Sequence, residues 1–329
     1  MELNCDLQSI FDRVAKTSRT IAVLGSMNAD YTVETERLPL PGETVSGGPL
    51  HILPGGKSAN QAAAASRIGA HVMMLGAVGD DGNAEFLLSH LQDAGVDVSA
   101  VKNVPGPSGT TVITVDSHAE NTIVYSAGSN AKVDAAYAQR SADAISGSAA
   151  LGLCLESPIE AVNRAAGIAH KAGVKVLLNN SPFRADLPDE LIADSDILLV
   201  NEHEMSQLLG IDEPDDGRWS SLDWDALAHR MELFGFHEAI VTLGSQGAYV
   251  LSSLPGAPRS VFVPAVAVHA VDTTGCGDAF MGSVLAGITA GMDLGQCAHL
   301  ATYVAAYAAT GVGAQSSYGT SAEILDRFL

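Results

Sequence analysis

The stretch Val271–Gly282, VDTTGCGDAFMG, places two glycines and an aspartate directly before an apolar run with helical character. Gly275 and Gly277 permit backbone conformations in which successive N–H groups point at one spot, and the following helix N-terminus adds positive potential there. The stretch therefore predicts an anion hole formed by the backbone from Gly275 through Cys276 to Gly277. Asp278 stands at its rim, where a carboxylate can take the proton of a hydroxyl that attacks a phosphoryl group.

A simpler interpretation of Asp278 remains open at this point. Aspartate is a favoured N-cap residue, so the side chain can serve only to start the helix. The preceding residues Asp272 and Thr274 go beyond what a cap requires, because they add oxygen ligands suited to a cation.

Outward from this stretch, short apolar runs alternate with helical patterns along most of the chain. Strands are expected at residues 21–24, 72–75, 149–155, 174–178, 197–200 and 239–243. Helices are expected at residues 59–69, 83–94, 159–172, 202–209, 279–290 and 294–309. Strands that alternate with helices of this length predict βαβ units and a mostly parallel sheet.

Two segments depart from the alternation. Residues 31–53 and 109–127 both carry strand patterns without an intervening helix, and the second is divided by a polar turn at 117–121, as in a β-hairpin. We expect the two segments to form a small sheet beside the main one. Ordinary surface hairpins are the alternative.

The stretch Pro54–Gln61, PGGKSANQ, ends like a phosphate-binding loop, but the match fails. That motif needs a glycine where this chain has His51, and the apolar neighbours of His51 are too bulky to wrap phosphates. A glycine turn followed by Ser58 as the cap of a helix explains part of the stretch. It does not explain why Lys57 and Asn60 stand on the first turn of that helix.

Polar residues follow two of the predicted strands, at the edge where α/β proteins bind ligands. Asn201 and Glu204 lie three apart on one helical face, where they can hold Mg²⁺ through waters and contact a triphosphate. A well-capped, solvated helix start is the alternative. The loop 242–247, TLGSQG, either lines a nucleotide pocket or is a turn into the next strand.

Composition narrows the class of protein. The chain has 329 residues, of which 47% are hydrophobic, enough for one large domain with a sizeable core. A net charge of −21 disfavours nucleic acids and anionic membranes as partners. Four cysteines without motif spacing predict reduced thiols in a cytoplasmic protein. Residues 1–20 lack the plan of a secretory signal and carry apolar residues at helical spacing, which predicts a short amphipathic extension.

These features together resemble the PfkB-type carbohydrate kinases, and within that family the ribokinase group. The resemblance covers the chain from about residue 20 to the C-terminus. It rests on these stretches, in the family's order: GSMNADYTVETERLPLPGETV, PGGKSANQAAAASRIGA, GDDGNAEFLLSHLQDAGVD, LCLESP, NEHE, TLGSQGAYV, DTTGCGDAFMG and GAQSS.

The resemblance implies a ribokinase-like three-layer αβα sandwich with a mostly parallel central sheet and a small β-sheet lid. The kinase domain would span residues 21–329 after an N-terminal extension at 1–20, with lid segments at about 31–53 and 109–127. The implied activity is ATP-dependent phosphorylation of D-ribose at O5, with Mg²⁺ and an activating K⁺. The lid would close over the sugar, exclude water and form the contact of a homodimer.

The resemblance also assigns roles to residues that match the family motifs. Asp278 would be the general base, next to the anion hole of Gly275, Cys276 and Gly277. The sugar would be bound by Asn28, Asp30, Gly56, Lys57, Asn60, Glu156 and Asp278. ATP would be contacted by Asn201, Thr242, Gly244, Ser245, Gly247, Gly277 and Thr302, with Glu204 near Mg²⁺. K⁺ would be held by Asp272, Thr274, Ala308, Gly311, Gly313 and Ser317.

Two residues and one segment depart from the family pattern, and several substrates remain open. The segment 179–182, NNSP, replaces a common Asn-Pro-Ala-Pro that lies away from the sugar. Ser58 replaces a glycine, which requires a negative φ at that position. Thr302 stands where a histidine is common near the adenine. Kinases of 2-deoxyribose, of another sugar or of a nucleoside are alternatives, as is a sugar-binding regulator without catalysis. A nucleoside would need an aromatic platform, and in a chain with 5% aromatic residues Tyr31 is the one aromatic residue beside the expected sugar residues Asn28, Lys57 and Asn60.

Overall fold

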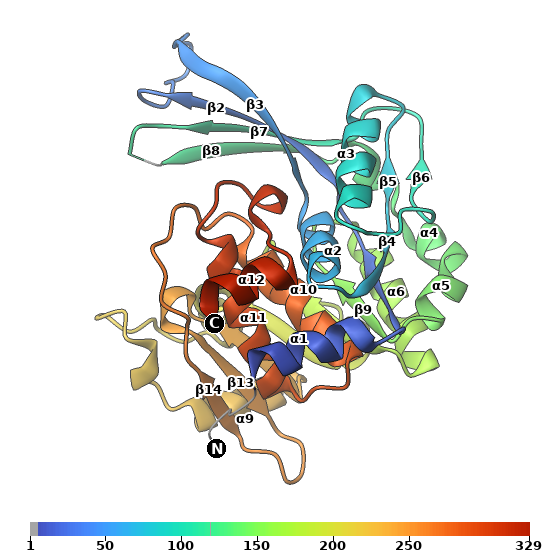
Figure 1. Cartoon of the computed structure of the whole chain (residues 1–329), viewed down its shortest axis with the longest axis vertical. Helices are drawn as coiled ribbons and strands as arrows, with labels where there is room; N and C mark the ends of the chain where they lie inside the picture. Colours follow the sequence, from blue (N-terminus) through green and yellow to red (C-terminus); the bar gives the residue numbers. More distant parts are fainter. Residues whose placement is uncertain (1–5, 119) are drawn as a thin grey trace.

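The computed structural model describes residues 6–118 and 120–329. Within them the largest sheet has eight strands in the order β14-β13-β12-β11-β10-β9-β1-β4 (Figure 1). These strands are β1 (Thr20–Leu24), β4 (His71–Leu75), β9 (Ala150–Leu153), β10 (Lys175–Asn179), β11 (Ile197–Asn201), β12 (Glu238–Thr242), β13 (Ala248–Ser252) and β14 (Ser260–Val263). Only β13 runs antiparallel to its neighbours β12 and β14, and every other pairing in this sheet is parallel, so the predicted mostly parallel sheet is confirmed.

Helices cover both faces of this sheet, which makes three layers. One face carries α1 (Leu7–Lys16), α2 (Lys57–Arg67), α3 (Gly82–Asp93), α10 (Cys276–Thr289), α11 (Leu294–Ala308) and α12 (Ser321–Phe328). The other carries α4 (Ala135–Arg140), α5 (Ala142–Ser146), α6 (Ile159–Ala172), α7 (Asp189–Ala193), α8 (Glu202–Leu209) and α9 (Trp224–Phe234). Side chains of each strand alternate between the two cores, as Ile21 and Ala22 of β1 do.

The two irregular segments form a second sheet, as predicted. Its strands β2 (Asn28–Thr35), β3 (Gly47–Gly55), β7 (Gly109–Val115) and β8 (Asn121–Ser126) lie in the order β3-β2-β7-β8. In Figure 1 this small sheet projects from the αβα body at the top of the view. A short third sheet pairs β5 (Ala77–Val78) with β6 (Lys102–Asn103).

The helix expected near the N-terminus is α1, and its apolar face is part of the core. Leu7, Ile10, Phe11 and Val14 are buried in the cluster that contains α10 and α12. The Arg13 guanidinium donates a hydrogen bond of 3.0 Å to the carbonyl oxygen of Gly291, just beyond α10. No described helix is long and apolar enough to cross a membrane.

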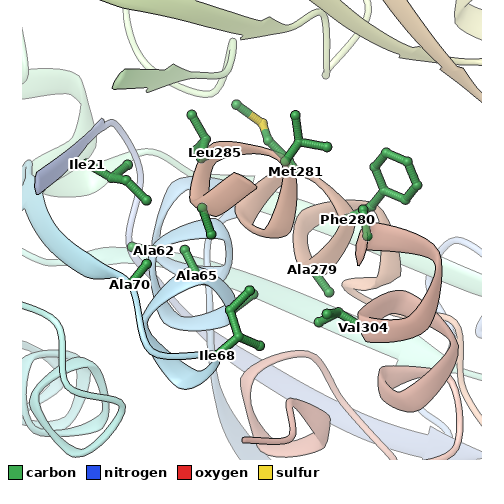
Figure 2. Packing of buried hydrophobic residues seen from close by; sticks show 14 of the residues in the cluster. Ile21, Ala62, Ala65, Ile68, Ala70, Ala279, Phe280, Met281, Leu285 and Val304 are labelled. Carbon is green, nitrogen blue, oxygen red and sulfur yellow. The ribbon is translucent and has the colours of Figure 1, made fainter. Parts of the chain in front are cut away.

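Close packing of α2 on α10 determines the geometry of the site. Figure 2 shows the two helices side by side, with Ala62 and Ala65 of α2 and Met281 and Leu285 of α10 among the buried residues of one core cluster. A Cβ atom on Gly282 would lie 2.4 Å from the carbonyl oxygen of Gln61, so only glycine allows this approach. The first turns of α2 and α10 are thereby brought next to each other.

Candidate active site

The predicted base is held by the predicted sugar-binding helix. Asp278 is 8% exposed, and its Oδ2 accepts a 2.9 Å hydrogen bond from the amide of Asn60. Its Oδ1 accepts a 3.1 Å hydrogen bond from Gln61, so each carboxylate oxygen has one amide donor and the group is fixed in orientation. Burial raises the pKa of Asp278 above its ordinary value, although the positive charge of Lys57 and the two amide hydrogen bonds oppose this effect.

Two expectations about helix starts are wrong. Helix α10 begins at Cys276 with Gly275 as its N-cap, so Asp278 lies in the first turn and is not the cap. Helix α2 begins at Lys57, and Ser58 is not its cap. The Ser58 hydroxyl donates instead to the carbonyl oxygen of Leu24 at 3.3 Å, and its helical backbone satisfies the requirement for a negative φ.

Gly275 and Gly277 differ in how much space surrounds them. Gly275 has φ of 75°, and an added Cβ would lie 2.5 Å from the Ala314 Cβ and 2.6 Å from the Tyr318 hydroxyl. Around Gly277 an added Cβ would meet no described atom within 4 Å, so a ligand has room to approach this backbone. The Cys276 N–H donates to the Thr273 carbonyl oxygen at 3.2 Å, which leaves Gly277 as the more accessible donor of the expected anion hole.

Asp30 lies near the start of β2, the inner strand between β3 and β7 of the small sheet. Its carboxylate accepts a hydrogen bond from the hydroxyl of Thr111 on the neighbouring strand β7. Burial raises the pKa of Asp30 to about 6, and the nearby charges of Glu156 and Asp278 add to this effect while Thr111 opposes it. A Cβ on Gly55 would lie 1.9 Å from the Asp30 Oδ2, so the opposite strand must carry glycine there.

Glu156 and Lys57 complete the charged group. Glu156 Oε2 accepts hydrogen bonds from the Ser26 hydroxyl at 2.5 Å and from the Lys57 backbone N–H at 3.0 Å. Burial alone would lower the pKa of the Lys57 ammonium, but the charges of Asp278 and Glu156 outweigh it and raise the pKa. Lys57 is therefore a cation beside the carboxylates of Asp278 and Glu156.

Gly56 and Asn28 lie at the junction of body and small sheet. Gly56 has φ of 89°, and an added Cβ would lie 2.9 Å from the backbone nitrogen of Asn28. The Asn28 side-chain oxygen accepts a 2.7 Å hydrogen bond from Asn130. Asn60 has less freedom than expected for a sugar ligand, since its oxygen accepts from Gln315 at 3.0 Å while its amide donates to Asp278.

A cavity of about 420 Å³ lies on the other side of Gly277. Its apolar wall includes Val266, Val268 and Phe280, which suits the flat face of a purine. It is lined by all the residues expected to contact ATP except Asn201, namely Thr242, Gly244, Ser245, Gly247, Gly277 and Thr302.

A second cavity of about 170 Å³ adjoins it and leads to the base. Thr242 and Gly277 line both cavities, and the second is also lined by Lys57, Asn201, Glu204, Gly275 and Asp278. A ligand that begins in the larger cavity can thus extend past Gly277 toward Asp278. The volume and the lysine in its lining fit a polyphosphate chain.

Asn201 and Glu204 form a capping box at the start of α8. The Asn201 oxygen accepts from the Glu204 N–H at 2.7 Å, and Glu204 Oε2 accepts from the Asn201 N–H at 2.9 Å. The helix-cap interpretation is therefore confirmed, yet both residues also line the second cavity. No group of three or more potential His, Cys, Asp or Glu ligands occurs among the described residues. One carboxylate beside a phosphate site fits Mg²⁺, which is commonly held by one or two carboxylates together with substrate phosphates.

The residues expected to hold K⁺ lie in the 272–274 loop, at the last residue of α11 and in the 311–317 segment that follows it. Asp272 accepts hydrogen bonds from the backbone N–H groups of Thr274 at 2.9 Å and Gly313 at 2.8 Å. Burial alone would raise the pKa of Asp272, but these N–H donors outweigh it and lower the pKa. Gly311 donates to the Ala308 carbonyl at 3.1 Å, and a Cβ on Gly311 would lie 2.8 Å from the Ser317 Cβ. Carboxylate, hydroxyl and carbonyl oxygens are the ligand types that a hard cation prefers.

Several residues of this site were not identified from the sequence. They are Ser26, Gln61, Thr111, Asn130, Gln315 and Tyr318, which hold the predicted residues in place. Gln61 could have been identified from the sequence, because it is a polar residue directly before the apolar run AAAA of a buried helix. The others act through contacts between distant parts of the chain and leave no local pattern.

The family follows from comparison with known proteins. The model of the pfkB family carbohydrate kinases matches residues 18–321, so the chain belongs to this family of sugar kinases. Among individual proteins, the ribokinase of Schizosaccharomyces pombe is 39% identical, over 92% of this chain and 96% of its own. The deoxyribokinase of Salmonella typhi is 34% identical, over 91% and 95% respectively. The structure of Arabidopsis thaliana ribokinase complexed with ribose and ATP has a TM-score of 0.84 and 29% identity, and covers 94% of this chain and 98% of that one.

Proposed function

We propose that this protein transfers the γ-phosphoryl group of ATP to O5 of D-ribose, which gives D-ribose 5-phosphate and ADP. One observation carries the proposal. Asp278 is bound by Asn60 of the sugar motif on one side and lines the cavity that continues into the nucleotide pocket on the other. A hydroxyl and a phosphoryl group can therefore meet at this carboxylate.

Asp278 is suited to be the general base of the transfer. Its raised pKa increases its affinity for the proton that it must take from the 5-hydroxyl as O5 attacks phosphorus. The Gly277 N–H and the Lys57 ammonium lie where negative charge develops on the transferred group. Mg²⁺, which Glu204 would help to hold, supplies charge neutralisation to the phosphates when bound.

Recognition of the sugar rests on groups of opposite hydrogen-bonding character. The carboxylates of Asp30 and Glu156 accept from hydroxyls, whereas Asn28 and Lys57 carry donors. Asn60 and the backbone at Gly56 complete the wall of the site. A site that hydrogen-bonds each hydroxyl disfavours sugars that lack one, because its buried polar groups are then left unpaired.

K⁺ is the proposed activating cation, at Asp272, Thr274, Ala308, Gly311, Gly313 and Ser317. This cluster adjoins the start of α10, and Asp272 links the 272–274 loop to the 311–313 loop. A cation there would add positive charge next to the anion hole and stiffen both loops.

The small sheet is the proposed lid and the proposed contact of a homodimer. Its register places Ile52, Val112 and Val124 on the face opposite to Asp30, and these side chains are 42%, 52% and 67% exposed. Exposed apolar side chains that adjoin one another on a sheet face are typical of an interaction surface. A second copy of the chain would cover that face. The free buried thiols of Cys154 and Cys297 support a cytoplasmic location.

A kinase of 2-deoxyribose is the second candidate, because a deoxyribokinase is among the similar relatives. Release of ADP from Mg-ATP should be measured with D-ribose, 2-deoxyribose, fructose, adenosine and uridine, in K⁺ and in Na⁺. We expect turnover to be highest with D-ribose and to depend on K⁺. Turnover restricted to another acceptor would contradict the assignment of the substrate while retaining Asp278 as the base.

A further inference from the structure

Asn130 is a buried polar residue at the junction of the small sheet and the body. It lies in the 3₁₀ helix η1 (Gly128–Lys132), shortly after the end of β8, and is 0% exposed. Its Oδ1 accepts a hydrogen bond from the Met27 N–H at 3.1 Å, and its Nδ2 donates to the Met27 carbonyl at 3.2 Å. The same Nδ2 donates to Asn28 Oδ1 at 2.7 Å, the shortest of the three bonds.

These bonds fix the orientation of the Asn130 side-chain amide and, through it, that of the Asn28 side-chain amide. A backbone N–H can only donate, so the Asn130 oxygen must face Met27 and the Asn130 nitrogen must face Asn28. The Asn28 oxygen is thereby engaged. Within residues 6–118 and 120–329 the Asn28 nitrogen has no hydrogen-bond partner. It is also not among the fully buried side-chain atoms there that lack a partner, so a ligand can reach it. Asn28 thus enters the sugar site as a donor.

Two strands of the small sheet begin beside Asn130. β2 begins at Asn28, and β7 begins beside it at Gly109. A Cβ on Gly109 would lie 2.1 Å from Asn130 Nδ2 and 2.4 Å from Asn28 Oδ1. Tyr125 of β8 accepts a 3.4 Å hydrogen bond from Asn130 and donates one of 3.4 Å to the Glu156 carbonyl. Asn130 therefore links the base of the small sheet to two sugar residues.

We propose that Asn130 is a positioning residue that makes Asn28 a fixed hydrogen-bond donor to one hydroxyl of the sugar, and so sets the preference for sugars that carry this hydroxyl. The inference rests on the proposed function and adds a specificity determinant that touches no substrate. The selected hydroxyl must accept a hydrogen bond from Asn28 and is left to donate its own proton to a carboxylate of the site.

The test compares kcat and KM for D-ribose, 2-deoxy-D-ribose and 3-deoxy-D-ribose at saturating Mg-ATP. The variants are Asn130→Ala, Asn28→Ala and the double variant. Asn130→Ala should lower kcat/KM for ribose about tenfold, the scale of one oriented hydrogen bond. It should reduce the preference for ribose over one deoxy sugar only, the same one that Asn28→Ala affects. The double variant should show no further loss of preference, because Asn130 acts through Asn28.

Two further variants separate positioning from folding. Asn130→Asp keeps the size of the side chain but cannot donate to Asn28 as a carboxylate, so it should lose the same preference. Ser129 precedes Asn130 in η1, and its hydroxyl donates a buried hydrogen bond of 2.8 Å to the carbonyl oxygen of Ala77. Ser129→Ala removes this bond and should lower the melting temperature without changing the preference for ribose over the deoxy sugars.

Equal loss of kcat/KM on all three sugars in both Asn130 variants would overturn the inference and make Asn130 merely structural. So would an unchanged preference in these variants when Asn28→Ala alters it. If the wild-type protein turns over no pentose, the proposed function itself fails, and the inference fails with it.

Discussion

Asn60 donates a 2.9 Å hydrogen bond to Asp278 across the contact of α2 and α10. The bond joins a residue of the sugar motif to the proposed base, and Gly282 makes it possible by letting the two helices approach closely. Gln315 in turn holds the oxygen of Asn60. The function of Asn60 in this arrangement includes holding the base in place, in addition to any contact with the sugar.

Replacing Asn60 by leucine is therefore expected to lower kcat more than it raises KM for ribose. Loss of an oriented base should cost about 10- to 100-fold in kcat, part of the contribution typical of general base catalysis. Steady-state kinetics with varied ribose would measure the two effects. A raised KM with normal kcat would show instead that Asn60 only binds the sugar.

Replacing Gln61 by leucine removes the donor to Asp278 Oδ1 and should raise the pKa of this carboxyl further. A base must be deprotonated to act, so activity is lost as the pH falls through its pKa. The acid limb of the kcat profile should thus move to higher pH in Gln61→Leu. The exposed Gln92→Leu on α3 is the matched control and should leave the profile in place. An unmoved limb in Gln61→Leu would contradict the role assigned to Gln61.

Binding of ribose is expected to weaken as the pH falls through about 6, where Asp30 becomes protonated. Protonation removes an acceptor for the sugar hydroxyls and leaves a neutral acid in its place. Calorimetry of ribose binding between pH 5 and 8, in the absence of nucleotide, would show this dependence. Asp30→Asn should bind weakly at every pH and lack this transition, and a wild-type affinity that is flat over the range would refute the assignment.

Gly275→Ala should unfold more easily than wild type and lose most activity. The substitution combines strain at φ of 75° with overlap against Ala314 and the Tyr318 hydroxyl. Gly173 provides the control, since its φ is 72° but an added Cβ meets no described atom within 4 Å. Gly173→Ala should cost about 1 kcal/mol of the free energy of unfolding and retain activity. Similar losses in the two variants would show that crowding around Gly275 is unimportant.

Long periodic segments were the part of the fold that could be predicted from the sequence. Helices α6 and α8 begin and end at the predicted residues, and the second sheet followed from strands without helices between them. Short helices such as α4, α5 and α7 span too few residues to show a helical period. The start of α10 was placed too late because glycines in a first turn resemble a loop.

The predicted site residues came from motifs, and the structure adds the residues that hold them. Asn130 and Gln315 could not be found because their partners, Asn28 and Asn60, lie far away in the sequence. Ser58 and Asn201 illustrate the opposite case, in which a helix-cap rule gave a wrong answer for one and a right answer for the other. Local propensity decided the second case, whereas the glycine turn at Gly56 overrode it in the first.

The most direct test of the account is Asp278→Asn, studied by single-turnover kinetics with Mg-ATP and ribose and by calorimetry of ribose binding. The amide keeps the size of the side chain but cannot accept the proton of the 5-hydroxyl. We predict that phosphoryl transfer falls by about 10³-fold or more while ribose still binds, as expected for a group that acts mainly in the transition state. Near-normal transfer in Asp278→Asn would contradict the assignment of Asp278 as the base.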